Sequence, residues 1–311
     1  VGILCLGTGG PYALLVAGRA LCGVGHALFM LGGITAIVRY SSLSSRVLCL
    51  NAFEMSAMCG VLFGMLAAGF LPGHWPWNWT LLAASTPQFL CLALLPVVAR
   101  SIPAGDAQGA RRRLFSRGEQ SPATGSTASL RHAIGIAFIT GFVIAIAWSS
   151  IGQFILPIRA SREFGLDRDG VALLLAIPQV VDVCLLLPLG MLADRTSHAR
   201  VLAIILLVLA AGVVTVAFGS LSAAVAGCVL FGIGLAAWML PVSLLNQNSP
   251  HTGVSWRTAL YRTCVDMGVF LGPILSGLLA QKGVLWILPG ATAIALALIS
   301  ARLLLPGRAA T

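Results

Sequence analysis

Charged residues are scarce in this sequence. They make up 9% of the 311 residues, while 58% are hydrophobic and the mean hydropathy is +0.97. A soluble domain carries roughly 25% charged residues. A soluble fold of this length could not bury so much apolar surface. The composition therefore excludes a soluble globular protein and predicts an all-α chain that crosses a lipid bilayer several times.

Cysteine pairs and catalytic motifs are also missing. The eight cysteines stand singly, and no C-x-x-C occurs, so we expect neither a disulfide framework nor a metal site. The sequence has no Gly-x-Ser-x-Gly, no His-Glu-x-x-His and no P-loop. We therefore expect no enzyme, no ATP-driven pump and no cofactor.

Lysine is nearly absent, since Lys282 is the single lysine among 19 basic residues, which against nine acidic residues give a net charge of +10. The arginines lie in short loops without a basic helix or an aromatic platform, which excludes nucleic-acid binding. Four basic residues fall on one side of the predicted spans: Arg159, Arg162, Arg168 and Lys282. The other side carries Arg39, Arg46, Arg100, Arg111, Arg112, Arg113, Arg117, Arg131, Arg195, Arg200, Arg257, Arg262, Arg302 and Arg308. The positive-inside rule then predicts a cytoplasmic linker and C-terminus in a bacterial inner (plasma) membrane. We expect a monomer.

Long apolar runs follow a short stub at 1–8. They cover about 12–38, 47–71, 79–100, 133–157, 170–193, 201–219, 222–246, 257–280 and 284–305. Each has about the length of a membrane helix. Residues 101–131 differ, because they are rich in Gly, Ser, Pro and Arg and have no apolar period. The sequence predicts an incomplete first half over 1–100, a basic linker over 101–131 and a second half over 132–311.

The two halves repeat. "LCGVGHALFML" at 21–31 matches "LFGIGLAAWML" at 230–240, and "FEMSAMCGVLFGMLAAGFL" at 53–71 matches "YRTCVDMGVFLGPILSGLL" at 261–279. Parallel halves of this kind are a known transporter design. Small residues permit close helix contact and Pro273 can bend its helix. The packing candidates are Gly23, Gly25, Gly60, Gly64, Gly268, Gly272 and Gly277.

The chain resembles the major facilitator superfamily. "GMLADRTSHAR" at 190–200 is similar to that family's loop motif Gly-x-x-x-Asp-Arg-x-Gly-Arg-Arg, and "GRALCGVGHA" at 18–27 is similar to its fourth-helix motif. The two glycine runs and the basic linker also resemble the family. In the loop motif Ser197 and His198 depart from the pattern, and Met65 stands where drug antiporters carry proline.

The resemblance implies a bundle of up to twelve helices. Residue 1 would fall late in the third, so about nine complete helices and a stub would be present. It also implies that the loop motif latches the two halves together. We expect the latch to involve Gly190, Asp194 and Arg195, with Asp194 at the helix start near Ser44 and Ser45, whose free N–H groups attract a carboxylate.

Asp182 is the main candidate for chemistry. It precedes Asp194 by twelve residues, which is about 18 Å along a helix and close to the bilayer centre. Charge there costs about 2.5–3.5 kcal/mol on insertion scales. Asp182 is either a proton-titrating or substrate-contacting carboxylate, or a neutral group hydrogen-bonded to a neighbouring helix.

Each of the other candidate residues has either a functional role or a purely structural one. Arg19 couples protons or holds a buried acid, as the resemblance implies, or it extends to the headgroups. Glu54 binds substrate, takes a proton or pairs with Arg262, its counterpart in the repeat. Arg262 and Asp266 are four apart, which also fits a simple intrahelical pair. His26 is a packing residue or a proton carrier.

These features predict a secondary active transporter that works by alternating access. We expect proton-coupled efflux of a small organic solute, with substrate, protons and lipid as the partners. The alternatives are a proton-coupled uptake symporter, a membrane sensor without transport activity, and an inactive truncated fragment.

Overall fold

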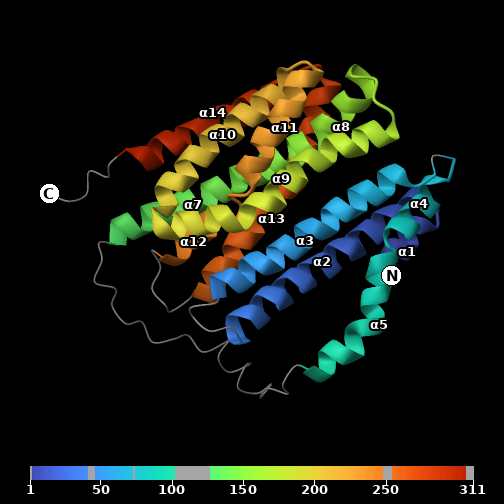
Figure 1. Cartoon of the computed structure of the whole chain (residues 1–311), viewed down its shortest axis with the longest axis horizontal. Coiled ribbons are helices and arrows are strands. Elements are labelled where there is room, and N and C mark those ends of the chain that lie inside the picture. Colours follow the sequence, from blue (N-terminus) through green and yellow to red (C-terminus); the bar gives the residue numbers. More distant parts are fainter. Residues whose placement is uncertain (1, 41–45, 73, 102–126, 248–253, 306–311) are drawn as a thin grey trace. The chain divides into compact units, whose positions relative to one another are not determined.

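The computed structural model describes residues 2–40, 46–72, 74–101, 127–247 and 254–305 (Figure 1). The chain divides into two compact units. Unit 1 comprises Val1–Thr35 and Leu71–Pro122, and unit 2 comprises Ala36–Phe70 and Ala123–Thr311. All regular structure in the described residues is helical.

Nine helical spans in the described ranges are long and apolar enough to cross a membrane. They run from 18 to 30 residues, as a hydrocarbon core of about 30 Å requires. The prediction of an all-α polytopic membrane protein is therefore confirmed.

Unit 1 contains short and long helices that meet at glycines. Its helices are α1 (Gly2–Gly7), most of α2 (Tyr12–Tyr40), α4 (Trp77–Ala84) and α5 (Thr86–Ser101). A Cβ on Gly18 would lie 2.9 Å from the carbonyl oxygen of Gly2, so α1 and α2 approach at backbone distance there. A Cβ on Gly7 would meet the Leu82 side chain at 2.6 Å, which packs α1 on α4.

Unit 2 holds the larger bundle. Its elements are α3 (Arg46–Phe70), α7 (Thr127–Ala147), η1 (Trp148–Ile155), α8 (Leu156–Ile158), η2 (Arg159–Glu163), α9 (Arg168–Arg195), α10 (His198–Phe218), α11 (Leu221–Leu235), α12 (Leu240–Gln247), α13 (Val254–Gln281) and α14 (Ile287–Leu304). Helix α10 is among the most enclosed of them and packs on α11 and α14. The Ser300 hydroxyl of α14 donates to the Ala203 carbonyl of α10 at 2.6 Å.

Two of the predicted apolar runs are broken helices. The run at 79–100 is interrupted at Ser85 between α4 and α5, and the run at 222–246 unwinds at 236–239 between α11 and α12. A proline opens each following helix, Pro87 in α5 and Pro241 in α12. Proline lacks a backbone N–H and restricts the preceding residue, so a helix readily ends just before it.

The run that begins with α7 contains two π-helical stretches, η1 and η2. The hydroxyls of Ser149 and Ser150 donate to carbonyls one turn back, at 2.8 Å and 2.6 Å, and so compete with the backbone for those acceptors. Pro157 follows η1 and cannot donate to the preceding turn. These features explain why the helix widens where the apolar sequence alone predicts a regular one.

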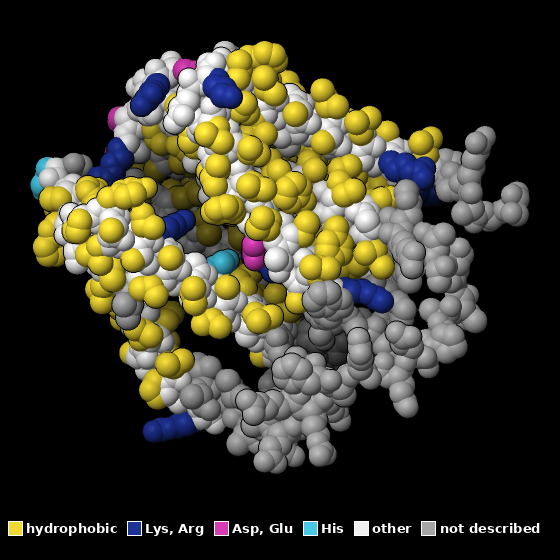
Figure 2. Space-filling view, turned by 180° about the vertical axis from the view of Figure 1, so that it is seen from behind, with side chains coloured by type: hydrophobic (Ala, Val, Ile, Leu, Met, Phe, Trp, Pro, Cys, Tyr) yellow, Lys and Arg dark blue, Asp and Glu magenta, His cyan; other side chains and the backbone are white. Residues whose placement is uncertain are grey.

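The surface carries many large apolar side chains. Exposed large hydrophobic side chains lie on every long helix, and they cover most of the described surface on the face shown in Figure 2. Such a surface fits a lipid environment.

Candidate functional site

Helices α3 and α9 pack along one continuous seam within unit 2. A Cβ on Gly69 would lie 2.2 Å from the Cβ of Ala172, and a Cβ on Gly190 would lie 3.0 Å from Nδ2 of Asn51. The two contact points are eighteen residues apart on each helix, which is about five turns. The helices are therefore antiparallel and present one unchanging face to each other. We call this contact line the α3–α9 seam.

Arg168 closes one end of the seam. Its guanidinium donates to the carbonyl oxygen of Ala68 in the last turn of α3. The last four carbonyls of a helix have no partner within it, so a cation there satisfies one of them and also complements the helix dipole.

The two helices of this seam carry three buried polar side chains. Glu54 of α3 is 3% exposed, and Gln179 and Asp182 of α9 are 3% and 4% exposed. One oxygen of each is buried without a hydrogen-bond partner in the described structure: Glu54 Oε2, Gln179 Oε1 and Asp182 Oδ1. Gln179 lies on the α9 stripe that runs from Ala172 to Gly190, because the spacings of seven and eleven residues correspond to about two and three turns.

The charges around the seam are coupled. Glu54 interacts electrostatically with Asp182 and with Arg262 and Asp266 of α13. Arg262 Nε lies 3.1 Å from Asp266 Oδ1, so the predicted intrahelical pair is present. The pair is an ionic contact and not a hydrogen bond, because Arg262 Nε has no hydrogen-bond acceptor in the described structure. Asp266 is 47% exposed, whereas Glu54 is buried.

The structure thus brings together four of the six residues selected from the sequence. Asp182, Glu54, Arg262 and Asp266 form one group in unit 2, which we call the carboxylate cluster together with Gln179. Sequence analysis missed Gln179. Its signal was an amide inside an apolar run, three residues and thus about one turn before Asp182.

Arg19 and His26 belong to unit 1. Both lie on α2, and both are exposed in the structure. Their proposed roles stay predictions.

The packing glycines differ between the two repeats. A Cβ on Gly268 would lie 2.7 Å from the Phe142 carbonyl, and a Cβ on Gly272 would lie 2.0 Å from the Ser149 hydroxyl, so both allow α13 to approach the α7–η1 helix closely. Pro273 lies inside α13 directly after Gly272. An added Cβ meets nothing within 4 Å at the remaining predicted positions, which are Gly23, Gly25, Gly60, Gly64 and Gly277.

The predicted latch is only partly visible. Gly190 belongs to the α3–α9 seam, and Arg195 is exposed at the end of α9. Ser44, Ser45 and the Asp194 side chain lie outside the described residues. A small recess lies beside Gly190, with Asn51, Leu186 and Ser243 in its lining.

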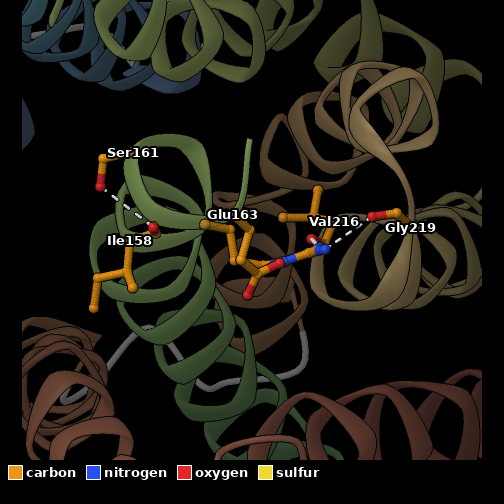
Figure 3. Close-up of polar contacts among 6 residues, drawn as sticks. Ile158, Ser161, Glu163, Val216 and Gly219 are labelled. Atoms are coloured by element: carbon orange, nitrogen blue, oxygen red, sulfur yellow. Dashed lines mark hydrogen bonds and ion pairs between the residues drawn. The ribbon is translucent and has the colours of Figure 1, made fainter. Parts of the chain in front are cut away.

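Arg159, near the Arg168 end of α9, caps a second helix (Figure 3). Its guanidinium donates to the carbonyls of Val216 and Gly219, the latter at 2.9 Å, where α10 ends. Its Nε donates to Glu163 at 2.6 Å, and the guanidinium lies 4.9 Å from the centre of the Phe164 ring. Two arginines, Arg159 and Arg168, thus cap the C-terminal ends of α10 and α3.

The carboxylate cluster can accept protons or hydrogen-bond donors. A buried charge in a membrane is costly, and either a counter-charge or a proton removes that cost. Arg262 is shared between Asp266 and Glu54, whereas Asp182 interacts electrostatically with Glu54. The cluster therefore has unused acceptor capacity in the middle of a membrane helix pair.

Comparisons with known proteins agree with this architecture. A family model described as Major Facilitator Superfamily matches residues 1–135 and 136–310. Among solved structures, a crystal structure of a single-substitution variant of the E. coli fucose:proton symporter FucP is similar, with a TM-score of 0.64 and 15% sequence identity. The match covers 97% of this chain and 80% of that one, and at this identity it shows the fold alone. A search among curated proteins found no match.

Proposed function

Because the chain belongs to the Major Facilitator Superfamily, and is thus a membrane transporter and not an enzyme, we propose that it moves a small organic solute by alternating access and couples this movement to protons. The half over 1–100 and the half over 132–311 rock about a central site, with 101–131 as the connection between them. Rocking exposes the site first to one side of the membrane and then to the other.

One observation carries the proton coupling. Glu54 and Asp182 are buried carboxylates on two packed membrane helices, they interact electrostatically, and each has an oxygen without a partner. Ionisable residues within membrane spans commonly mark ion and substrate pathways. In the proposed cycle Asp182 takes up and releases the proton, and Glu54 and Arg262 adjust to the charge that it gains or loses.

Efflux in exchange for protons is the direction that we propose. The alternative is uptake with protons, and FucP, the protein with the similar fold, is a fucose:proton symporter. Both directions use the same carboxylates, so the test must allow flux either way.

The proposal is tested in proteoliposomes that contain the purified chain and the pH indicator pyranine. A panel of sugars, amino acids, organic acids and organic amines is added outside, with and without an imposed pH gradient. We expect at least one compound to move protons across the membrane. Asp182→Asn should abolish that proton movement, because an amide cannot be deprotonated.

Asp169→Asn is the matched control. Asp169 lies on the same helix α9, but it is exposed in the first turn. It should leave the proton signal unchanged. A solute flux that ignores the pH gradient and survives Asp182→Asn would refute proton coupling. If the solute flux is coupled to protons, its direction relative to the proton movement separates efflux from uptake.

The loop motif is the second part of the proposal. The Asp194 carboxylate holds the helix start near Ser44 and Ser45 and so stabilises the state that is closed toward the cytoplasm. Asp194→Asn should increase opening of the cytoplasmic ends, and disulfide cross-linking of cysteines placed on them measures this. An unchanged cross-linking rate would remove the latch.

A further inference from the structure

The carboxylate cluster is unbalanced in its hydrogen bonding. The unpartnered atoms at Glu54, Gln179 and Asp182 are all oxygens. All three side chains are at least 96% buried, because their exposed fractions are 3%, 3% and 4%. In the cluster these three unpartnered acceptors outnumber the one unpartnered donor, Arg262 Nε, so the site is suited to a ligand that brings donors.

The cluster is also unbalanced in charge. The cluster contains three carboxylates, Glu54, Asp182 and Asp266, and one guanidinium, Arg262. Asp266 already takes part of that positive charge through its 3.1 Å contact with Arg262 Nε. In their ionised forms the four groups sum to two negative charges, which an anionic ligand would increase and a cationic ligand would reduce.

Gln179 makes the site more than an acidic pair. Its amide lies about one turn from Asp182 and on the α9 stripe that touches α3, the helix that carries Glu54. It supplies a neutral acceptor beside two charged ones. A group with several N–H donors can bond all three oxygens, whereas a bare proton can satisfy one at a time.

We propose that the solute moved by this transporter is a small organic cation with N–H donors, an ammonium compound, bound by Glu54, Gln179 and Asp182. The ammonium group contacts the two carboxylates, and its remaining N–H reaches Gln179. This inference rests on the proposed transport function and names the substrate class of the same site.

The first experiment measures binding without transport. The unfolding midpoint of the purified chain in detergent is recorded with ethanolammonium chloride, ethylene glycol or sodium glycolate, and with sodium chloride for ionic strength. The three probes have similar size and carry a positive, a neutral and a negative group in turn. We expect ethanolammonium alone to raise the midpoint, by about 2–4 °C near saturation.

Variants locate the effect. Glu54→Gln and Asp182→Asn should abolish the ethanolammonium shift, while the control Asp169→Asn keeps it. Gln179→Met preserves shape and removes the acceptor, so it should reduce the shift. This variant keeps the test available if either charge variant fails to fold. Equal shifts from all three probes, or a cation shift that survives each of the three site variants, would overturn the cation site.

Combination with the proteoliposome panel separates the two proposals. If ethanolammonium does not bind, while another compound drives Asp182-dependent proton movement, the substrate class is wrong and proton-coupled transport stands. If ethanolammonium binds at the cluster but no compound moves protons, the cation site stands and proton coupling is wrong.

Discussion

Gly69 of α3 and Ala172 of α9 are packed so closely that a Cβ on the glycine would lie 2.2 Å from the alanine Cβ. No pair of real Cβ atoms occupies such a distance, so the α3–α9 seam depends on the missing side chain. The contact lies next to the Arg168–Ala68 hydrogen bond. Together these contacts fix the end of the seam away from Gly190.

Gly69→Ala should therefore destabilise the protein. An extra methyl group in a tight contact costs about 1–3 kcal/mol through displaced neighbours. The control is Gly64→Ala on the same helix, where an added Cβ meets nothing within 4 Å. We expect it to be neutral or to stabilise by up to about 1 kcal/mol through helix propensity. Thermal unfolding in detergent measures both.

The double variant Gly69→Ala/Ala172→Gly moves the methyl group from one helix to the other. It should recover most of the stability lost in Gly69→Ala, because the volume at the contact is restored. A double variant that is less stable than the single one would contradict the packing argument.

Gly272→Ala makes a second test within α13. Its new Cβ would lie 2.0 Å from the Ser149 hydroxyl, and that hydroxyl donates to the Ala145 carbonyl at 2.8 Å and the Gly268 carbonyl at 3.3 Å. The substitution should lower stability by about 1–3 kcal/mol. Gly277→Ala, five residues later in open space, should not. Equal unfolding midpoints for the two variants would show that α13 can shift without cost.

These glycines also show how far the sequence predicts the structure. The internal repeat aligns Gly60 and Gly64 with Gly268 and Gly272, and predicts the same role for each pair. In the structure an added Cβ clashes only at the second pair. Periodicity identifies small residues on one helix, but tertiary packing decides which helix, if any, approaches them. Gly69, outside the predicted set, makes the close contact on α3.

The candidate site was predictable in part for a similar reason. Isolated charges in apolar runs identified Glu54, Asp182, Arg262 and Asp266, because charge inside a membrane is costly. The pairing of Glu54 with Asp182 depends on the antiparallel register of α3 and α9, which residue spacing within one helix does not contain. Gln179 is uncharged and so gave a weaker signal, although it is as buried as Glu54 and Asp182.

Arg159 should contribute to stability through α10 rather than through its ion pair. Glu163 is 54% exposed, so that pair is worth little in water. The carbonyls of Val216 and Gly219 lose a charged donor in Arg159→Ala (Figure 3), which costs about 1–3 kcal/mol. Glu163→Gln and Arg162→Ala, with Arg162 exposed in the same η2 segment, should each cost less than about 0.5 kcal/mol. Urea unfolding of the purified variants compares them. Similar losses in Arg159→Ala and Glu163→Gln would transfer the role to the ion pair.

Glu54 and Arg262 should be coupled even though they lie on different helices. Glu54 interacts electrostatically with Arg262, and each has a buried atom without a hydrogen-bond partner. Arg262→Gln alone leaves Glu54 beside two other carboxylates and should destabilise the protein. Glu54→Gln added to it removes the stranded charge. The double-mutant cycle should therefore give a coupling of about 0.5–3 kcal/mol in favour of the double variant.

The matched cycle pairs Arg262→Gln with Asp169→Asn, and it should be additive because Asp169 is exposed at the start of α9. Additive free energies in the Glu54 cycle would mean that Arg262 serves Asp266 alone, and that the carboxylate cluster holds its negative charge without help from α13.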